Sequence, residues 1–570
     1  MQAMIEFKEA VADVAARAGL DRALALEAVS VPRERERADL SLPCFRLGKP
    51  PHEVAKRIAA AFVPGGLLAS AEAAGPFVNF RFERAAATRL ILDAVGPAFG
   101  RTDLGRGKCV VIDYGSPNIA KPLLFHHLRS AVIGQALCRL HRFCGYEVVG
   151  LNYLGDVGTA FGKLMVGFQR FGEAHTAEAL NETYVRASTL CAEDEGAMAE
   201  AREWARKLEE EDPTAKRLWE GARRISLEGF LEVYDWLGIR HDVVDGEQMY
   251  VKPAAALIER LLSDGRARES DGAVVLDPAD PKLGVLLLRK SDGATLYQTR
   301  DLAAAIDRHR RYGFARMLYV VDIAQELHFQ QLFSGLEALG HPWARQCRHV
   351  AFGQVLMGGK RAKTREGRGV LLTEVLREGE RRAAEIIREK NAALANPAEV
   401  AKAVGVAAVV FTDLGLLVRK DIHFDWDEIL SFDGRTGPYL QYVHASASSI
   451  LRKGGGAVPP EPSRGGAGAP GGPGLLLHDL EWELVRRLAE WPEVVVKACE
   501  ECEPSLVSAH LYELAREFRS YHTAGGRDAT LRVLVDDAAL RAARLRLVAA
   551  VQSNLAIGLE LLGIAALVEM

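Results

Sequence analysis

The sequence lacks the features that mark membrane and secreted proteins. No stretch reaches the roughly 18 consecutive apolar residues that a membrane-spanning helix needs. The beginning of the chain mixes charged residues into a helical pattern and has no uninterrupted apolar core, so we expect no signal peptide. These absences predict a cytoplasmic protein without a membrane partner.

The chain also lacks a strong excess of charge and any clear cysteine framework. A net charge of −4 over 570 residues does not indicate nucleic-acid binding, so an RNA ligand would need local basic patches. The eight cysteines are scattered, which in a large chain without a secretory signal indicates reduced thiols. Cys499 and Cys502 are spaced like half of a zinc site. No second ligand pair follows them, and we predict no protein-bound metal.

What the chain does have is a pattern that changes along its length and predicts a multi-domain α/β protein. Residues 1–105 combine helical periodicity with a short alternating strand at 77–82, which is typical of a separate α+β domain. Residues 397–570 are helical by periodicity and predict an all-α bundle. Residues 454–474 interrupt it with a Gly/Pro-rich loop that has little apolar surface to bury.

Residues 106–396 alternate short apolar strands with helices, which predicts a parallel sheet with helices on its faces. The expected strands include residues 110–112, 148–151, 285–288 and 318–321. Between about 165 and 245 the pattern is helical and highly charged, so we expect a helical insertion in this domain.

The segment from Ser116 to Ser130 (SPNIAKPLLFHHLRS) is the most informative part of the chain. It follows the apolar run at 110–112 and opens a helix with apolar periodicity. A strand, a polar turn and a helix in this order present ligand-binding groups at the carboxyl edge of a doubly wound sheet. Because helix-start amides favour a polyphosphate, the residues alone suggest a nucleotide site.

Two further segments carry weaker signals. The glycine-rich basic loop at 358–367 follows an apolar strand, although basic loops are mostly solvated. Tyr439 and Tyr442 are three residues apart on an expected helix and so share a face. Exposed aromatic rings there can stack on unpaired RNA bases, and the alternative is that they pack in the core of the bundle.

Together these segments resemble the class I aminoacyl-tRNA synthetases, in the form found in the arginyl-tRNA synthetases. Residues 116–130 are similar to the family's HIGH region, S-P-N-x-A-K-P-x-H-x-G-H-L-R-S. Leu124 stands in place of the first histidine and His126 in place of the glycine, whose absence needs a local rearrangement. The basic loop is similar to the family's altered KMSKS loop, in which Lys121 would replace the missing second lysine.

The resemblance implies a Rossmann-type catalytic domain that binds ATP, with Mg²⁺ carried by the substrate. The implied catalytic residues, which would stabilise the phosphoryl transition state, are His127, Lys121, Lys363 and Arg365. The implied ATP-binding residues are Pro117, His126, His127, Gly155, Val355, Met357, Lys363 and Thr364.

The resemblance also implies an arginine pocket, and a guanidinium favours carboxylate partners. The implied residues are Asn118, Asp156, Glu247, Tyr297, Asp301 and Gln325. Taken singly, Asp301 could instead be a helix N-cap and Glu247 a solvated turn residue.

Segments at both ends of the chain resemble tRNA-binding elements of the same family. The implied tRNA contacts are Asn79 and Phe82 in an N-terminal domain that binds the tRNA elbow, and Tyr439, Tyr442 and Met570 in an anticodon-binding bundle. A proline that the family carries near its carboxyl end is missing, so we expect a less fixed backbone before Met570.

The resemblance as a whole predicts a monomeric arginine–tRNA ligase. It would form arginyl-adenylate from L-arginine and ATP and transfer the arginyl group to tRNA(Arg). One alternative is a paralogue that activates arginine for another acceptor, which the changes at Leu124 and His126 favour. Another is a non-catalytic RNA-binding protein.

Overall fold

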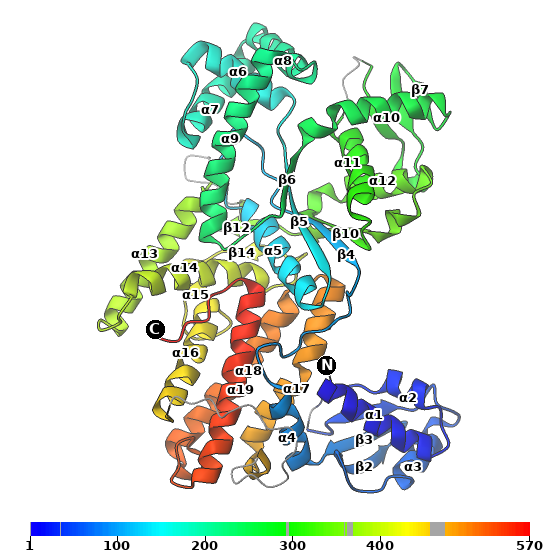
Figure 1. Cartoon of the computed structure of the whole chain (residues 1–570), viewed down its shortest axis with the longest axis vertical. Helices are drawn as coiled ribbons and strands as arrows, with labels where there is room; N and C mark the ends of the chain where they lie inside the picture. The colour runs from blue at the N-terminus through cyan, green and yellow to red at the C-terminus, as the bar shows by residue number, and fades with distance from the viewer. Residues whose placement is uncertain are drawn as a thin grey trace.

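The computed structural model describes residues 2–32, 34, 36–291, 296–357, 360–361, 369–455 and 473–570. They form an elongated molecule in which a central sheet separates two lobes from a helical bundle and a small N-terminal domain (Figure 1). Lys363, Thr364 and Arg365 lie outside the described residues, as does most of the expected loop at 454–474.

The N-terminal domain is built on a three-stranded antiparallel sheet of order β1-β3-β2. Its elements are α1 (Gln2–Arg17), α2 (Arg22–Ala28), β1 (Leu40–Pro43), α3 (Pro51–Ala60), β2 (Leu68–Ala74), β3 (Phe77–Phe82) and α4 (Arg84–Ala94). Along β3, Val78, Phe80 and Phe82 are buried while Phe77 is exposed. This period of two confirms the strand predicted at 77–82.

A five-stranded parallel sheet of order β11-β10-β4-β5-β6 forms the centre of the molecule. Its strands are β4 (Cys109–Asp113), β5 (Glu147–Leu154), β6 (Val243–Gly246), β10 (Arg316–Asp322) and β11 (Cys347–Phe352). Helix α5 (His127–Phe143) follows β4. Because the chain leaves β4 toward β5 on one side and reaches β10 on the other, a crevice opens between the carboxyl ends of β4 and β10.

The helical insertion predicted within this domain is confirmed. It consists of α6 (Thr159–Phe171), α7 (Ala177–Glu193), α8 (Glu195–Glu209) and α9 (Pro213–Trp236), which lie between β5 and β6 in the chain. Asp194 and Asp212 cap α8 and α9 by accepting hydrogen bonds from amides of the first turn, as helix-start carboxylates do. The four helices form one of the two lobes in Figure 1.

The prediction that residues 285–288 belong to the parallel sheet is wrong. The strand β9 (Leu286–Arg289) joins β7 (Ala267–Ser270) and β8 (Ala273–Leu276) in a separate antiparallel sheet of order β7-β8-β9. A parallel neighbour needs a crossover of about a dozen residues or more, usually helical. The link from β8 to β9 holds only a short 3₁₀ turn at Pro281–Leu283, so an antiparallel return results. Helices α10 (Val251–Ser263), α11 (Tyr297–Tyr312) and α12 (Glu326–Ala338) complete the second lobe.

The C-terminal part of the chain is a helical bundle, as predicted. Within the predicted range 397–570 its helices are α14 (Pro397–Leu414), α15 (Trp426–Ile429), α16 (Gly437–Lys453), α17 (Asp479–Glu501), α18 (Ser505–Arg527) and α19 (Ala538–Leu562), and α13 (Leu372–Lys390), which comes before that range, packs against α14. The Thr436 hydroxyl caps α16 by accepting from the Tyr439 amide at 3.1 Å, and Pro438 occupies the first turn. The small sheet β13-β12-β14 joins the bundle to the central domain through β12 (Val355–Met357), β13 (Lys360–Arg361) and β14 (Ile422–His423). Short 3₁₀ helices lie at Glu247–Tyr250, Ile323–Gln325, Pro342–Gln346, Pro473–Leu475 and Ala529–Leu531.

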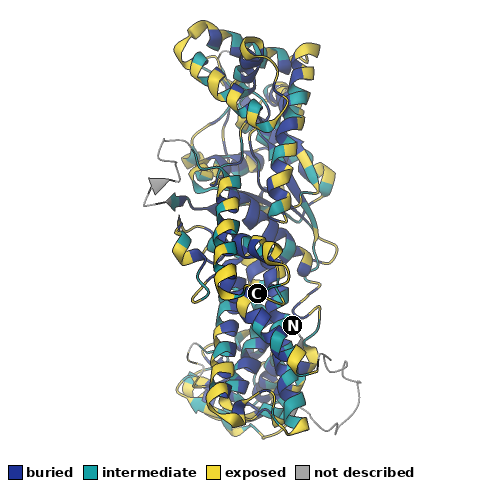
Figure 2. Ribbon diagram, turned by 90° about the vertical axis from the view of Figure 1, so that its left-hand side faces the viewer, coloured by how far each residue is buried: buried dark blue, intermediate teal, exposed yellow. Residues whose placement is uncertain are grey.

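Helix α19 is long and apolar enough, by length and composition, to cross a membrane. However, 56% of its apolar window is buried, and α19 packs against α16, α17 and α18. In Figure 2, buried residues, coloured dark blue, continue along the helices through this end of the molecule. A central position in the bundle therefore accounts for its apolar composition.

A buried ion pair joins the central domain to the bundle. Arg129, in the first turn of α5, is 1% exposed and lies 3.3 Å from the carboxylate of Asp413 in α14. Its guanidinium also donates to the carbonyl oxygens of Lys420 at 2.8 Å and Val418 at 3.1 Å. Helix α5, which follows the β4–α5 turn, is thereby attached to the segment of Val418 and Lys420 that leads into β14.

We predict that Arg129→Met destabilises the protein by about 3–5 kcal/mol, because it leaves the Asp413 carboxylate buried without its partner. The midpoint of calorimetric unfolding should fall, and the double variant Arg129→Met/Asp413→Leu should recover part of the loss. Arg202→Met, at an exposed position of α8, is the control. An unchanged midpoint for Arg129→Met would show that the ion pair does not hold the two parts together.

Candidate active site

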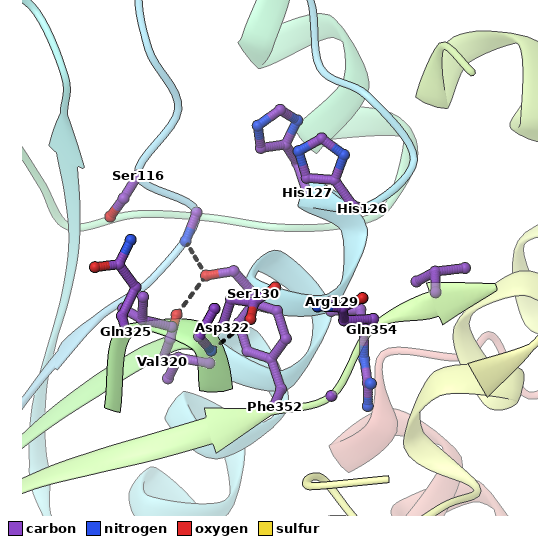
Figure 3. A pocket seen from close by; sticks show the side chains of 15 residues that line it. Ser116, His126, His127, Arg129, Ser130, Val320, Asp322, Gln325, Phe352 and Gln354 are labelled. Carbon is purple, nitrogen blue, oxygen red and sulfur yellow. Dashed lines mark hydrogen bonds between the residues drawn. The ribbon is translucent and has the colours of Figure 1, made fainter. Parts of the chain in front are cut away.

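A cleft of about 410 Å³ opens at the crevice between β4 and β10. Three segments line it: residues of the β4–α5 turn, the end of β10 with the turn after it, and residues 352–355 between β11 and β12. Figure 3 shows the rings of His126 and His127 on one side and Ser116 and Gln325 on the other, with Ser130 between them. The predicted residues His126, His127, Gln325 and Val355 thus lie around one cavity.

The β4–α5 turn is held in an unusual backbone conformation. Ser116 and Ala120 both have positive φ angles, 44° and 64°, which cost non-glycine residues on the order of 1–3 kcal/mol each. The Ser116 hydroxyl donates to Asp113 at 2.8 Å, and the Ala120 amide donates to the Ser226 hydroxyl at 2.9 Å. Because these bonds come from the end of β4 and from α9, the surrounding fold maintains the turn.

Ser130 connects the two sides of the crevice. Its hydroxyl accepts from the Gly115 amide at 2.8 Å and donates to the Val320 carbonyl at 2.7 Å. The single oxygen therefore fixes the β4–α5 turn against β10 and closes the floor of the cleft.

His127 is held as a neutral hydrogen-bond donor. The Leu124 amide donates to its Nδ1 at 2.8 Å, so Nδ1 keeps its lone pair and the hydrogen resides on Nε2. Burial, together with the neighbouring ring of His126, lowers the pKa of His127 to about 3. An imidazole at the start of α5 with a free Nε2–H can donate to an anionic oxygen.

The two departures from the HIGH pattern have simple local consequences. His126 has an ordinary helical backbone with φ −66° and ψ −20°, so a non-glycine residue fits there without backbone strain. Leu124 forms an isolated antiparallel β-bridge with Leu371. Its side chain packs so closely on Gly369 that a Cβ added to Gly369 would lie 2.7 Å from Cδ1 of Leu124. Leu124 does not line the cleft.

Pro117, Asn118 and Gly155 form a tight contact between the turn and the end of β5. The Gly155 amide donates to the Pro117 carbonyl at 3.1 Å. A Cβ at Gly155 would lie 2.1 Å from Oδ1 of Asn118, so only glycine permits this approach.

Asp156, the next residue, is buried. It accepts from the Gln248 amide at 2.9 Å, and Arg223 lies 3.5 Å from its carboxylate. Burial raises the pKa of Asp156 to about 6 despite these two partners.

Two carboxylates expected in the arginine pocket each have one basic partner. Glu247 lies 2.7 Å from the guanidinium of Arg300, and Asp301 lies 2.8 Å from Nε2 of His328. Burial raises the pKa of Glu247, and the negative charge of Asp301 adds to the shift, which places the two carboxylates in one electrostatic environment. Asp301 lies inside α11, so the N-cap interpretation is excluded.

Lys121 lies away from the cleft lining. It is exposed, and its ammonium lies 5.2 Å from the ring centroid of Tyr184 in α7. Met357 belongs to β12, although its side chain is outside the described residues. The loop residues Lys363, Thr364 and Arg365 are likewise outside the described part of the chain.

The aromatic residues expected to contact tRNA differ in exposure. Phe82 is 5% exposed and stacks on Phe7 with ring centroids 4.0 Å apart, and Tyr439 is 6% exposed. Tyr442 is 40% exposed, and the guanidinium of Arg519 in α18 lies 5.2 Å from its ring centroid. Asn79 is half-buried and accepts from the Ser41 hydroxyl at 3.0 Å.

Hydrogen bonds fix the C-terminal tail on the bundle. The Met570 carbonyl accepts from Asn391 at 2.9 Å, and the Val568 carbonyl accepts from Arg452 at 3.0 Å. His444 and Gln441 bind the carbonyls of Leu567 and Ala565 at 2.7 and 2.9 Å. These bonds correct the expectation of a loose tail, because side chains of α16 replace the rigidity that a proline would add.

The family described as "tRNA synthetases class I (R), catalytic domain" matches residues 97–426. The chain belongs to the arginyl-tRNA synthetase family. The arginyl-tRNA synthetase N-terminal domain matches residues 5–82, and the DALR anticodon-binding domain matches residues 440–570.

Relatives of this family match the chain over almost its entire length. An arginine–tRNA ligase of Halothermothrix orenii is 36% identical and spans 98% of this chain and 99% of the relative. One of Exiguobacterium sibiricum is 40% identical over 95% of both. The structure is similar to that of Thermus thermophilus arginyl-tRNA synthetase, with a TM-score of 0.78, 26% identity and 99% of each chain covered.

Within the described ranges, no group of three or more His, Cys, Asp or Glu side chains is arranged to hold a metal ion. All eight cysteines are free thiols, including Cys499 and Cys502. The sequence placed His328 near Gln325 without giving it a role at the site, and Arg519 was not among the residues expected there. Both contact expected residues from distant parts of the sequence, and no local pattern identifies such contacts.

We predict that His127 stays in one neutral Nε2–H form at pH values of about 5 to 8. Because its pKa lies below the ordinary 6.5, the unfolded chain binds more protons than the folded one as the pH falls, and His127 destabilises the fold progressively below pH 6.5. Histidine-selective nitrogen NMR, assigned with His127→Gln, measures this form. Titration of His127 near pH 6.5 would contradict its description as a buried neutral donor.

Proposed function

We propose that this protein is an arginine–tRNA ligase. The carboxylate of L-arginine attacks the α-phosphorus of ATP, pyrophosphate leaves, and the terminal ribose hydroxyl of tRNA(Arg) then takes the arginyl group from the adenylate. One observation supports the proposal: His127, a neutral donor, and Gln325 line the same cleft between β4 and β10, and the segment that follows Gln325 contacts the Asp301 carboxylate. Gln325 lines that cleft, and His328, three residues later, binds Asp301.

For ATP, we assign His127 and the amides at the start of α5 to the phosphates. The Nε2–H of His127 donates to a phosphate oxygen without adding a charge, and Lys121, Lys363 and Arg365 supply positive charge to the transition state. The remaining ATP contacts would come from Pro117, His126, Gly155, Val355, Met357 and Thr364. Mg²⁺ would arrive with the nucleotide.

For arginine, we assign Asn118 and Asp156 to the α-amino end of the substrate. The strained turn holds Asn118 against Gly155, next to Asp156. Glu247, Tyr297, Asp301 and Gln325 would surround the side chain, where a carboxylate can take the guanidinium in two parallel hydrogen bonds.

For tRNA, we assign the direct stacking contact to Tyr442. Its ring is the more exposed of the two tyrosines, and Arg519 beside it adds positive charge suited to a phosphodiester. Tyr439 and Phe82 are buried, so we propose that they support tRNA contacts from below the surface, while Asn79 and Met570 contact tRNA directly. We also propose that residues 1–105, 106–396 and 397–570 form three domains, that the protein is a monomer and that it is cytoplasmic.

The paralogue that activates arginine for another acceptor remains the second candidate, because Leu124 and His126 depart from the HIGH pattern. The ordinary backbone of His126 weakens this case.

Charging of total tRNA with labelled arginine tests the proposal, with lysine as the control amino acid. We expect arginine-specific charging, and Lys121→Ala should lower it by about 10²–10³-fold through loss of transition-state charge. The matched control is Lys216→Ala on the exposed face of α9. Failure of the wild-type protein to charge tRNA would contradict the ligase, and normal charging by Lys121→Ala would refute the role of that lysine.

We predict that Tyr442→Ala raises KM for tRNA by about 5- to 100-fold, since stacking on one base contributes roughly 1–3 kcal/mol. Arg519→Gln should raise KM for tRNA as well and lower the salt dependence of tRNA binding by about one phosphate contact. Both variants should keep the wild-type KM for arginine. Arg202→Gln, at an exposed position of α8, is the control for loss of a surface charge. An unchanged KM for tRNA in Tyr442→Ala would show that the anticodon binds elsewhere.

A further inference from the structure

His328 lies between the two α11 residues that we assign to the arginine side chain. Tyr297 and Asp301 are one helical turn apart, so both side chains leave α11 on the same face. The His328 ring centroid is 5.0 Å from that of Tyr297, and its Nε2 is 2.8 Å from Oδ2 of Asp301. His328 comes from the first turn of α12 and is 8% exposed, so one buried imidazole contacts both residues.

The two ring nitrogens of His328 show which form it takes. Asp301 offers only acceptors when ionised, so Nε2 carries the hydrogen of this bond. Nδ1 is buried, and no hydrogen-bond partner for it exists among the described residues. A protonated ring would leave a buried N–H without an acceptor, which costs more than an unused lone pair. The geometry therefore favours a neutral imidazole.

With a neutral His328, the Asp301 carboxylate has no cationic partner among the described residues. Glu247 and Arg300 lie 2.7 Å apart and cancel one another. The charges of the buried pair Asp113 and Arg308, which lie 2.9 Å apart, also cancel. Asp301 then carries the charge that a single guanidinium matches, whereas an imidazolium at position 328 would neutralise it.

We propose that His328 is a positioning residue for arginine recognition. Its Nε2–H orients the Asp301 carboxylate without taking its charge, and its ring supports Tyr297 at the mouth of the pocket, where Tyr297 is 46% exposed. This inference rests on the arginine site proposed above and adds a residue that acts through Asp301 and Tyr297 rather than by touching the reacting atoms.

Three substitutions separate the hydrogen bond from the packing of the ring. His328→Gln keeps an N–H donor near the position of Nε2, His328→Asn keeps one only near Nδ1, and His328→Phe keeps the ring without a donor. We expect His328→Phe and His328→Asn to raise KM for arginine by about tenfold to a hundredfold, the range for a lost bond to a charged group. His328→Gln should stay within about threefold of wild type, and kcat and KM for ATP should change little in all three.

The control is His309→Phe, on the same helix as Asp301 but stacked on Trp343 with centroids 4.6 Å apart. Calorimetric titration of arginine into each protein, with tRNA present, supplies the dissociation constant directly. An unchanged KM for arginine in His328→Phe overturns the inference. An equal loss in His328→Gln and His328→Phe overturns the role of the hydrogen bond. Should His328→Phe fail to fold, the comparison of Gln with Asn, two amides that differ by one methylene, still decides.

These outcomes are distinct from failure of the proposed function. Absence of arginine binding by the wild-type protein would overturn the ligase and this inference together. Arginine binding by the wild type, with no change in the three variants, would overturn the inference alone.

Discussion

The buried guanidinium of Arg129 is the constraint on which the arrangement of the active site depends. It fixes the first turn of α5, and so the ring of His127, to Asp413 in the helical bundle. The same guanidinium holds the carbonyls of Val418 and Lys420, just before β14, which pairs with β12 at the far side of the cleft. A charge removed from water is stable only when it is paired and hydrogen-bonded, as the Arg129 guanidinium is here. The start of α5, the strand before the basic loop and helix α14 therefore share one rigid contact.

Around this contact, the site combines a neutral hydrogen-bond donor, His127, with the carboxylate of Asp301, which lacks a cationic partner among the described residues. His127 is kept neutral by burial and by the amide that occupies its Nδ1, so in the proposed function it binds phosphate without attracting the arginine carboxylate away from the reacting phosphorus. Gln325 lines the other side of the cleft, and His328, three residues later, binds Asp301 and leaves the charge of that carboxylate available. In the proposed function, phosphate recognition and guanidinium recognition thus use groups of different charge, and each end of arginine meets a distinct environment.

Local signals in the sequence predicted most of the fold and part of the site. The β4–α5 turn was predictable because strand, polar turn and helix are contiguous, and the helix at Gly437 because Thr436 and Pro438 mark its start. Strand 285–288 was assigned to the wrong sheet, since periodicity identifies a strand but not its neighbour. Burial of Phe82 and the contact of His328 with Asp301 depend on packing between distant segments. The pattern of residues along the chain holds no information about such contacts. The roles of individual site residues came from the family resemblance, because the residue types and their spacing alone left those roles open.

Arginine-dependent exchange of labelled pyrophosphate into ATP, with tRNA present, tests the central claim most directly. It reports formation of arginyl-adenylate in the cleft, independently of transfer to the ribose. The account predicts exchange that requires arginine and that lysine does not support. A folded protein that binds tRNA and ATP yet shows no arginine-dependent exchange would contradict it, because the cleft at β4 and β10 would then not be the place where arginine is activated.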